Sequence, residues 1–265
     1  MSILVFDSGI GGLTVLREVR VLMPEQHFVY AVDDAAFPYG DWEEAGLTQR
    51  MLDVFEGLVA RHTPDMIIVA CNTASTLILP YLREKYAFPI VGTVPAIKPA
   101  AERTASGQVS VLATPGTVQR QYTRGLIKEF ASMTNVRLVG SDHLADLAET
   151  FMLTGKADEE AISNEIRGCF VDVHGARTDI VVLGCTHYPL LTNVMRRLAP
   201  WPVDWLNPAE PIARHARSLI PASDEVSLEQ DIAVFSAGMP SPERRRLLAG
   251  FGLQSQAMDA PPVQT

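Results

Sequence analysis

The chain has 265 residues, 47% of them hydrophobic, and a formal net charge of −9. This length suits two small domains or one large α/β domain, and the hydrophobic content excludes a disordered or collagen-like chain. No apolar run approaches the ~20 residues of a membrane-spanning helix, so we expect no membrane partner. The only basic cluster, Arg244 to Arg246, is interpreted as an exposed helical turn, and we expect no nucleic-acid partner.

In chain order, short apolar runs alternate with segments of helical periodicity. The runs that indicate strands are 3–6, 28–32, 66–70, 109–113, 136–139, 180–184 and 232–235. The segments that indicate helices are 12–23, 45–61, 75–86, 117–131, 159–174 and 190–198. Strands that are apolar on both faces and followed by helices are typical of a parallel sheet covered on both sides. We expect an open α/β architecture with its chemistry at the carboxyl ends of the strands.

One sequence pattern occurs twice. DMIIVACNTAS (65–75) and DIVVLGCTHYP (179–189) each place a cysteine six positions after an aspartate, at the end of an aliphatic run. The repetition favours two related halves, whose strand ends would meet at one cleft if the halves faced each other. Pro-rich segments near residues 94 and 207 are the candidate crossovers, and 254–265 is expected to be a loose tail. We therefore expect one domain from residues 1–94 and 208–265, and a second from 95–207.

The three cysteines, Cys71, Cys169 and Cys185, are an odd number without a disulfide spacing. This favours a reducing, cytoplasmic setting, which also agrees with an N-terminus that lacks the pattern of a secretory signal. Cys71 precedes a helix start, where backbone N–H groups favour a thiolate, and Cys185 has His187 two residues away to exchange its proton. A buried cysteine that acts only as a small hydrophobe remains the alternative for each, and Cys169 is expected to lie in the core.

The first strand leads into FDSGIGGLTVL (6–16). Gly9 and Gly11 suggest a dinucleotide fingerprint, with Asp33 or Asp34 as the ribose acid, but Thr14 occupies the place of the third glycine. The interpretation that we favour places Asp7 in a cleft beside a cysteine, with Ser8 and the turn amides holding an anion. A purely structural cap at Asp7 stays open.

Two further loops are ambiguous on spacing alone. FPYGDW (37–42) brings Tyr39 and Gly40 near the same sheet edge, and ATPGTV (113–118) offers Thr114 or Thr117 as hydroxyl donors. A surface loop is an equally good interpretation of either. No compact CxxC or HxxxH completes a metal site around Cys185 and His187, so no metal is expected.

Taken together and in order, FDSGIGGLTVL, PYGD, ACNTAS, VPAIKPA, ATPGTV and GCTHYPLL resemble the glutamate racemase family, within the cofactor-independent amino-acid racemases. The resemblance extends to about Leu253. It implies two pseudo-symmetric α/β domains, each a mainly parallel sheet flanked by helices, with the active site between them. It also implies a bacterial enzyme without a cofactor that interconverts L- and D-glutamate for peptidoglycan, and so for cell shape, commonly as a homodimer.

The resemblance assigns roles residue by residue. Cys71 and Cys185 would be the acid/base pair, supported by Asp7 and His187. The substrate-binding residues would be Asp7, Ser8, Tyr39, Gly40, Asn72, Thr73, Thr186 and His187. Glu149 stands where the family has a glutamate, but the preceding SDHLADLAE departs from the family pattern.

The chain begins directly on its first strand, so we expect no activation by a cell-wall precursor of the kind linked to a leading extension. Three other functions stay open: an aspartate racemase, a cysteine hydrolase that uses Cys185 and His187, and a non-catalytic ligand-binding module.

Overall fold

The computed structural model describes residues 1–221 and 227–258. The chain divides into two compact units, unit 1 (Met1–Thr93 and Ala209–Thr265) and unit 2 (Val94–Pro208). Each unit is built on its own parallel sheet flanked by helices, which confirms the predicted fold class.

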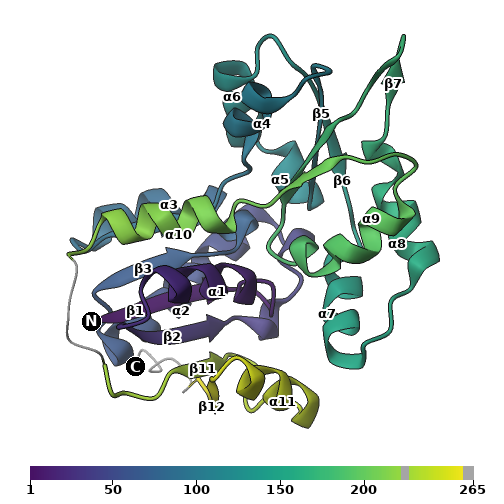
Figure 1. The fold of residues 1–265 in the computed structure, drawn as a ribbon. Helices are drawn as coiled ribbons and strands as arrows, with labels where there is room; N and C mark the ends of the chain where they lie inside the picture. The colour runs from purple at the N-terminus through teal and green to yellow at the C-terminus, as the bar shows by residue number, and fades with distance from the viewer. Residues whose placement is uncertain (222–226, 259–265) are drawn as a thin grey trace. The chain divides into compact units, whose positions relative to one another are not determined.

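The sheet of unit 1 has six strands, all parallel. In spatial order these are β12 (Gln254–Ala257), β11 (Ile232–Phe235), β2 (His27–Val32), β1 (Ser2–Asp7), β3 (Met66–Val69) and β4 (Ile90–Gly92). Figure 1 shows β1, β2 and β3 side by side. Asp7 pairs in register with Val32, and Phe6 with Val69, so the carboxyl ends of the three central strands lie at one edge.

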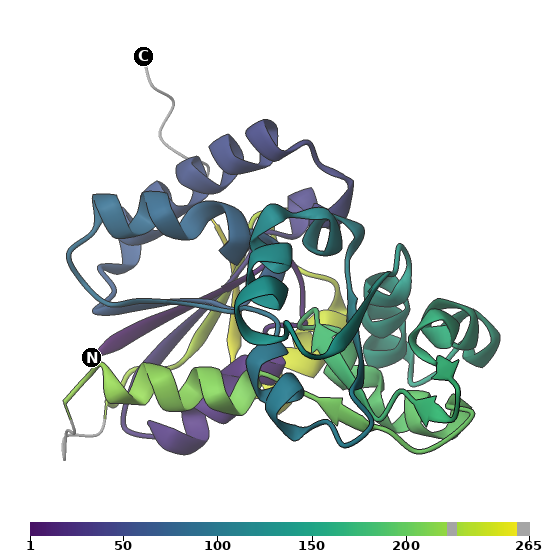
Figure 2. The ribbon, with the colours of Figure 1, turned by 90° about the horizontal axis from the view of Figure 1, so that it is seen from above.

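Helices cover both faces of this sheet, which explains why its central strands are apolar on both sides. Figure 2 shows α2 (Glu44–His62) and α3 (Asn72–Lys85) on one side, and α1 (Leu13–Leu22) and α10 (Ala209–Ser218) on the other. The remaining helical segments of the unit are α11 (Pro242–Gly250) and the 3-10 turns η1 (Asp34–Ala36) and η2 (Tyr39–Asp41). The core beneath α2 and α3 includes Leu4, Phe6, Phe55, Ile67 and Ile78.

Unit 2 is built in the same way on a smaller scale. Its parallel sheet runs β10 (Asp204–Leu206), β9 (Ile180–Gly184), β5 (Gln108–Ala113) and β6 (Asn135–Gly140). Its helices are α4 (Ile97–Arg103), α5 (Pro115–Gln119), α6 (Gln121–Phe130), α7 (Leu144–Thr154), α8 (Glu159–Ile166) and α9 (Thr192–Leu198). Two 3-10 turns, η3 (Arg167–Cys169) and η4 (Tyr188–Leu191), and an antiparallel hairpin of β7 (Asp172–Val173) and β8 (Ala176–Arg177) complete it.

All seven predicted strands are present, and three expectations need correction. The helix predicted over 159–174 ends at Ile166 and is followed by η3 and the hairpin, which turns through positive φ at His174 and Gly175. The helix predicted over 117–131 is two helices, separated by extended backbone at Arg120. The segment near 207 contains β10 and the start of α10, and the chain divides between its two units at Pro208 and Ala209. Residues 254–257 of the expected tail form β12, while 259–265 lie outside the described residues.

Two smaller expectations agree with the structure. Arg245 and Arg246 are exposed on α11 as predicted, whereas Arg244 is partly buried because it pairs with Asp34. Cys169 is buried in unit 2, where burial raises the pKa of its thiol to about 12. Within 1–221 and 227–258, none of the helices combines the length and the apolar character that a bilayer crossing requires.

Candidate active site

Asp7 ends β1 inside a tight glycine turn. Its carboxylate is fully buried, and Oδ1 accepts the Gly9 N–H at 2.9 Å. The Tyr30 hydroxyl donates to the Gly9 carbonyl at 2.6 Å and closes the turn from β2. A Cβ at position 12 would lie 2.7 Å from the Asp7 Cβ and 2.9 Å from the Tyr30 oxygen, so only glycine fits there. Close packing therefore accounts for the glycine at position 12.

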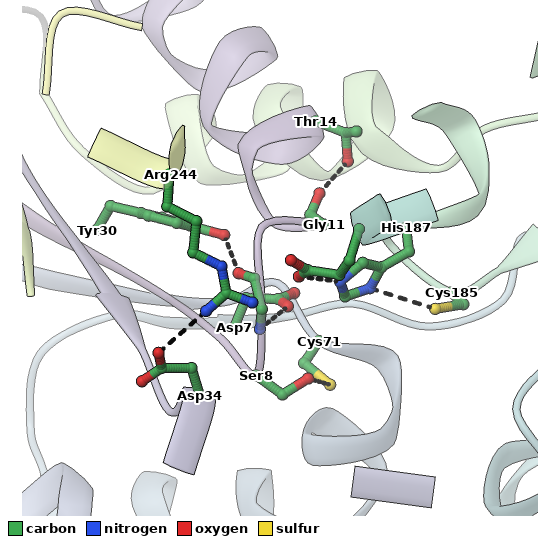
Figure 3. Close-up of polar contacts among 12 residues, drawn as sticks. Asp7, Ser8, Gly11, Thr14, Tyr30, Asp34, Cys71, Cys185, His187 and Arg244 are labelled. Carbon is green, nitrogen blue, oxygen red and sulfur yellow. Dashed lines mark hydrogen bonds and ion pairs between the residues drawn. The ribbon is translucent and has the colours of Figure 1, made fainter. Parts of the chain in front are cut away.

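Cys71 lies directly after β3, which pairs with β1, and is the N-cap residue of the fourteen-residue helix α3. Its sulfur accepts the Ala74 N–H at 3.5 Å and lies 3.8 Å from the Ser8 hydroxyl oxygen (Figure 3). Backbone N–H groups and the positive end of a helix stabilise negative charge at this position. The helix start at Cys71 agrees with the sequence prediction, and the contact between Cys71 and Ser8 is a finding of the structure.

The next residue, Asn72, is unusual for a buried amide. Its side chain is 2% exposed, and neither its Oδ1 nor its Nδ2 has a hydrogen-bond partner among the described residues. An unsatisfied buried polar group costs about 1–3 kcal/mol, so such groups are found where a ligand completes them. Thr73 follows it and is also buried.

Cys185 occupies the matching place in unit 2, directly after β9. Its sulfur lies 3.7 Å from His187 Nδ1, and His187 Nε2 lies 3.1 Å from Glu149 Oε1 of α7. Figure 3 shows the imidazole joined by its two nitrogens to the thiol and to the carboxylate. Cys185, Thr186, His187 and Glu149 are all buried. The chain thus forms a Cys–His–Glu relay that is protected from solvent.

The charge state of this relay follows from its partners. Burial lowers the pKa of His187, but the hydrogen bonds to Cys185 and Glu149, and the charges on both groups, raise it well above its usual value. With a proton on each nitrogen, His187 donates to the sulfur on one side and to the carboxylate on the other.

The strand that carries Cys185 is held close to its neighbour. A Cβ at Gly184 would lie 2.8 Å from the Ala113 Cβ of β5 and 3.2 Å from the Leu112 carbonyl oxygen. After β5, Thr114 is the N-cap residue of α5 and Thr117 lies within that helix, and their hydroxyl oxygens are 3.1 Å apart. Thr117 is fully buried, whereas Thr114 is partly exposed.

Tyr39 and Gly40 lie in η2, and the Tyr39 ring packs in the same buried cluster as Cys71. The Tyr39 hydroxyl donates to Asp33 Oδ2 at 2.7 Å, and Arg50 of α2 holds both oxygens of that carboxylate. Asp34 accepts the Ala237 N–H and pairs with Arg244 of α11. Both aspartates suggested as ribose acids are thus engaged by protein groups, and Thr14 bonds the Gly11 carbonyl where the fingerprint needs a glycine.

Sequence reasoning overlooked Asp33 and Arg50 as neighbours of the site. The only signal was an aspartate directly after a buried strand, with an arginine seventeen residues later. In the part of the chain that the structure describes, no group of three or more His, Cys, Asp or Glu residues is arranged to hold a metal ion.

Comparison with known proteins identifies the family. Residues 14–216 match the Asp/Glu/Hydantoin racemase family model. The chain belongs to this family.

Family members similar to this chain include glutamate racemases from two bacteria. The protein from Sinorhizobium medicae is 60% identical over 259 residues, which cover 97% of this chain and 96% of the relative. The protein from Brucella canis is 59% identical over 256 residues, which cover 95% and 92%. Membership of the family makes the chain a racemase, an enzyme of the isomerase class, and confirms the predicted resemblance.

A solved family member has the same fold. The crystal structure of Escherichia coli glutamate racemase, in complex with L-glutamate and the activator UDP-MurNAc-Ala, matches with a TM-score of 0.87 and 39% identity. The match covers 98% of this chain and 99% of that one. Nearly the whole chain therefore follows the fold of an amino-acid racemase.

Proposed function

We propose that this protein is a cofactor-independent glutamate racemase, which interconverts L- and D-glutamate and provides D-glutamate for bacterial peptidoglycan. The observation that carries the proposal is the presence of two cysteines, each directly after a parallel strand and each with its own polar partners. The high identity to glutamate racemases along almost the entire chain supports glutamate as the substrate.

The chemistry requires two acid/base groups. Inversion of the α-carbon removes a proton from one face and returns one to the other, and no electron sink such as pyridoxal phosphate is needed if both transfers are assisted. One thiolate takes the α-proton and becomes a thiol, while the other thiol gives its proton to the opposite face and becomes a thiolate. A reference pKa of about 8.5 suits a thiol to both roles.

Cys71 and Cys185 are the two groups in this proposal. A backbone N–H of α3 donates to the Cys71 sulfur and supports its thiolate form. We assign proton transfer to and from Cys71 to Asp7, which ends the neighbouring strand β1. His187 does the same for Cys185, with Glu149 orienting the imidazole. Each turnover leaves the protonation states exchanged, so the enzyme is ready for the opposite direction.

The proposed substrate-binding groups are Ser8, Tyr39, Gly40, Asn72, Thr73 and Thr186, together with Asp7 and His187. The unpartnered amide of Asn72 offers one donor pair and one acceptor to a substrate carboxylate and ammonium. We propose the predicted domains, 1–94 with 208–265 and 95–207, as the carriers of the two half-sites. A homodimer in the cytoplasm completes the proposal.

The test is racemisation in D₂O without added cofactor. Purified protein is incubated with L-glutamate, D-glutamate or L-aspartate, and circular dichroism and α-deuterium incorporation are followed. We expect both glutamate enantiomers to react and aspartate to react far more slowly. Cys71→Ser and Cys185→Ser should each lower kcat by roughly 10²–10⁴-fold.

The matched control is Cys169→Ala, because Cys169 is the third cysteine and is buried with its thiol protonated. This variant should retain activity. Full activity of both serine variants, or deuterium that never enters glutamate, would refute the proposal.

A further inference from the structure

Asp33 follows β2, and its fully buried carboxylate is held by two side chains. Arg50 of α2 donates to it through Nε at 2.8 Å and Nη2 at 2.6 Å, in the paired geometry that arginine offers to a carboxylate. Tyr39 of η2 donates its hydroxyl proton to Oδ2 at 2.7 Å. Three separate elements of unit 1 therefore meet at one carboxylate.

This arrangement keeps Asp33 ionised. Burial raises the pKa of Asp33, but the hydrogen bonds from Arg50, Ser236 and Tyr39 outweigh burial and hold it below its usual value. Burial and the Asp33 charge raise the pKa of Tyr39 well above 10, so its hydroxyl remains a donor. The direction of each hydrogen bond is thereby fixed: Arg50 and Tyr39 donate, and the Asp33 carboxylate accepts.

Asp33 and its partners are connected to the Cys71 half-site in two ways. The Tyr39 ring packs in the same buried cluster as Cys71, and the charge of Cys71 contributes to the raised pKa of Tyr39. The Asp33 backbone N–H donates to the Asp7 carbonyl at 3.0 Å, across the pair β1–β2.

Arg50 also has a contact away from Asp33. Its guanidinium lies 5.8 Å from the centre of the Trp42 ring, whose N–H donates to the Ala36 carbonyl.

We propose that Arg50 is a positioning residue of the racemase. Through Asp33 it fixes the Tyr39 side chain, and with it the Tyr39–Gly40 turn, beside the Cys71 thiol. The inference rests on the proposed function, because its kinetic tests measure the racemisation of glutamate. Lysine would supply the charge but only a single point of attachment, so the planar fork of arginine is required to hold both oxygens while Tyr39 shares one.

Kinetic variants test the proposal. Arg50→Ala should lower kcat/KM by roughly 10–100-fold, because a small displacement of groups around the reacting atoms is costly. Arg50→Lys should fall between this variant and the wild type. The control is Glu56→Ala, which lies on the same helix and removes the exposed pair with Lys85, and it should retain wild-type kinetics. Full activity of Arg50→Lys would overturn the requirement for a fork.

Two measurements separate positioning from a purely structural role. Millimolar guanidinium chloride should partly restore the activity of Arg50→Ala, because the Arg50 side chain is 30% exposed and leaves an open path to Asp33. In a double-mutant cycle, Tyr39→Phe with Arg50→Ala should lose little more than the more damaging single change. Additive losses and no rescue would refute action through Tyr39.

A third measurement needs no substrate. In the Cys185→Ser background, iodoacetamide labels Cys71, since Cys169 is buried with its thiol protonated. Arg50→Ala should speed this labelling several-fold, guanidinium should slow it again, and Glu56→Ala should leave it unchanged. An unchanged rate in Arg50→Ala would overturn the proposal even if the wild type failed to racemise glutamate, a failure that would refute only the proposed function.

Discussion

The two cysteine regions hold a reactive thiol in different ways. At Cys71 the sulfur is met by a backbone N–H from the start of α3 and by a hydroxyl, groups that keep their protons at all ordinary pH values. At Cys185 the sulfur is met by an imidazole that is itself held by a buried carboxylate. The hydrogen-bond partners described for the two sulfurs therefore differ: a backbone N–H and a hydroxyl at Cys71, and a titratable His–Glu pair at Cys185. Two units built on the same plan thus place a cysteine at the same point of the sheet but surround its sulfur with different hydrogen-bond partners.

The largest effect is expected when the titratable partner of Cys185 is removed. His187→Asn should lower kcat by roughly 10²–10⁴-fold, because Cys185 loses the group that exchanges its proton. The equilibrium constant between enantiomers is one, so kcat/KM must fall equally in both directions. The primary isotope effect of α-deuterated glutamate should rise more in the direction in which Cys185 removes the α-proton than in the direction in which Cys71 removes it. The exposed His174→Asn variant serves as control, and equal isotope effects in both directions would contradict the prediction.

Glu149→Gln keeps the shape of the relay and removes its charge. We expect a loss in kcat of roughly 10–100-fold, and the alkaline limb of the pH profile should move to lower pH because His187 loses its proton more easily. A profile that does not move would contradict a role for Glu149 in the protonation of His187.

The same variant predicts a pH-dependent change in stability. The pKa of His187 is raised in the folded protein, so its contribution is complete below the unfolded value of about 6.5 and is lost as pH rises through the folded value. The advantage of the wild type over Glu149→Gln, about 3–5 kcal/mol, should therefore shrink with rising pH. Urea denaturation across pH measures it.

A smaller effect is expected from the two close approaches that position the half-sites. Gly12→Ala and Gly184→Ala each place a methyl group against a neighbouring Cβ, at 2.7 Å in unit 1 and 2.8 Å in unit 2. Each should lower the free energy of unfolding by about 1–3 kcal/mol. Gly57→Ala, at a helical position with nothing within 4 Å, is the control and should be neutral or stabilising. Thermal denaturation distinguishes these outcomes.

The smallest effect is expected at Ser8. Its hydroxyl lies 3.8 Å from the Cys71 sulfur, a long contact, so Ser8→Ala should cost about 1 kcal/mol of transition-state stabilisation, or roughly fivefold in kcat/KM. The rate of Cys71 alkylation as a function of pH gives a second measure. A loss as large as that of His187→Asn would mean that the two cysteines depend on their side-chain partners equally.

The sequence predicts the two sheets well because their central strands are buried on both faces. It misses β12 because Gln254 and Ser255 carry no apolar signal in an edge strand, and β4 because three residues are too few to establish a period. The glycine turn after β1 and the helix start at Cys71 follow from local sequence, and both are present. The fork between Arg50 and Asp33 depends on how α2 packs against the end of β2, which no local pattern encodes.

The solitary amide of Asn72 has an evolutionary consequence. Selection for thermal robustness alone would replace a buried side chain that lacks partners among the described residues by leucine or methionine of similar volume. In the proposed function, asparagine at this point lowers the stability of the free protein and supplies a hydrogen-bonding group for the substrate. Random mutagenesis screened only for heat resistance should therefore replace Asn72 early and yield more stable variants that bind glutamate weakly.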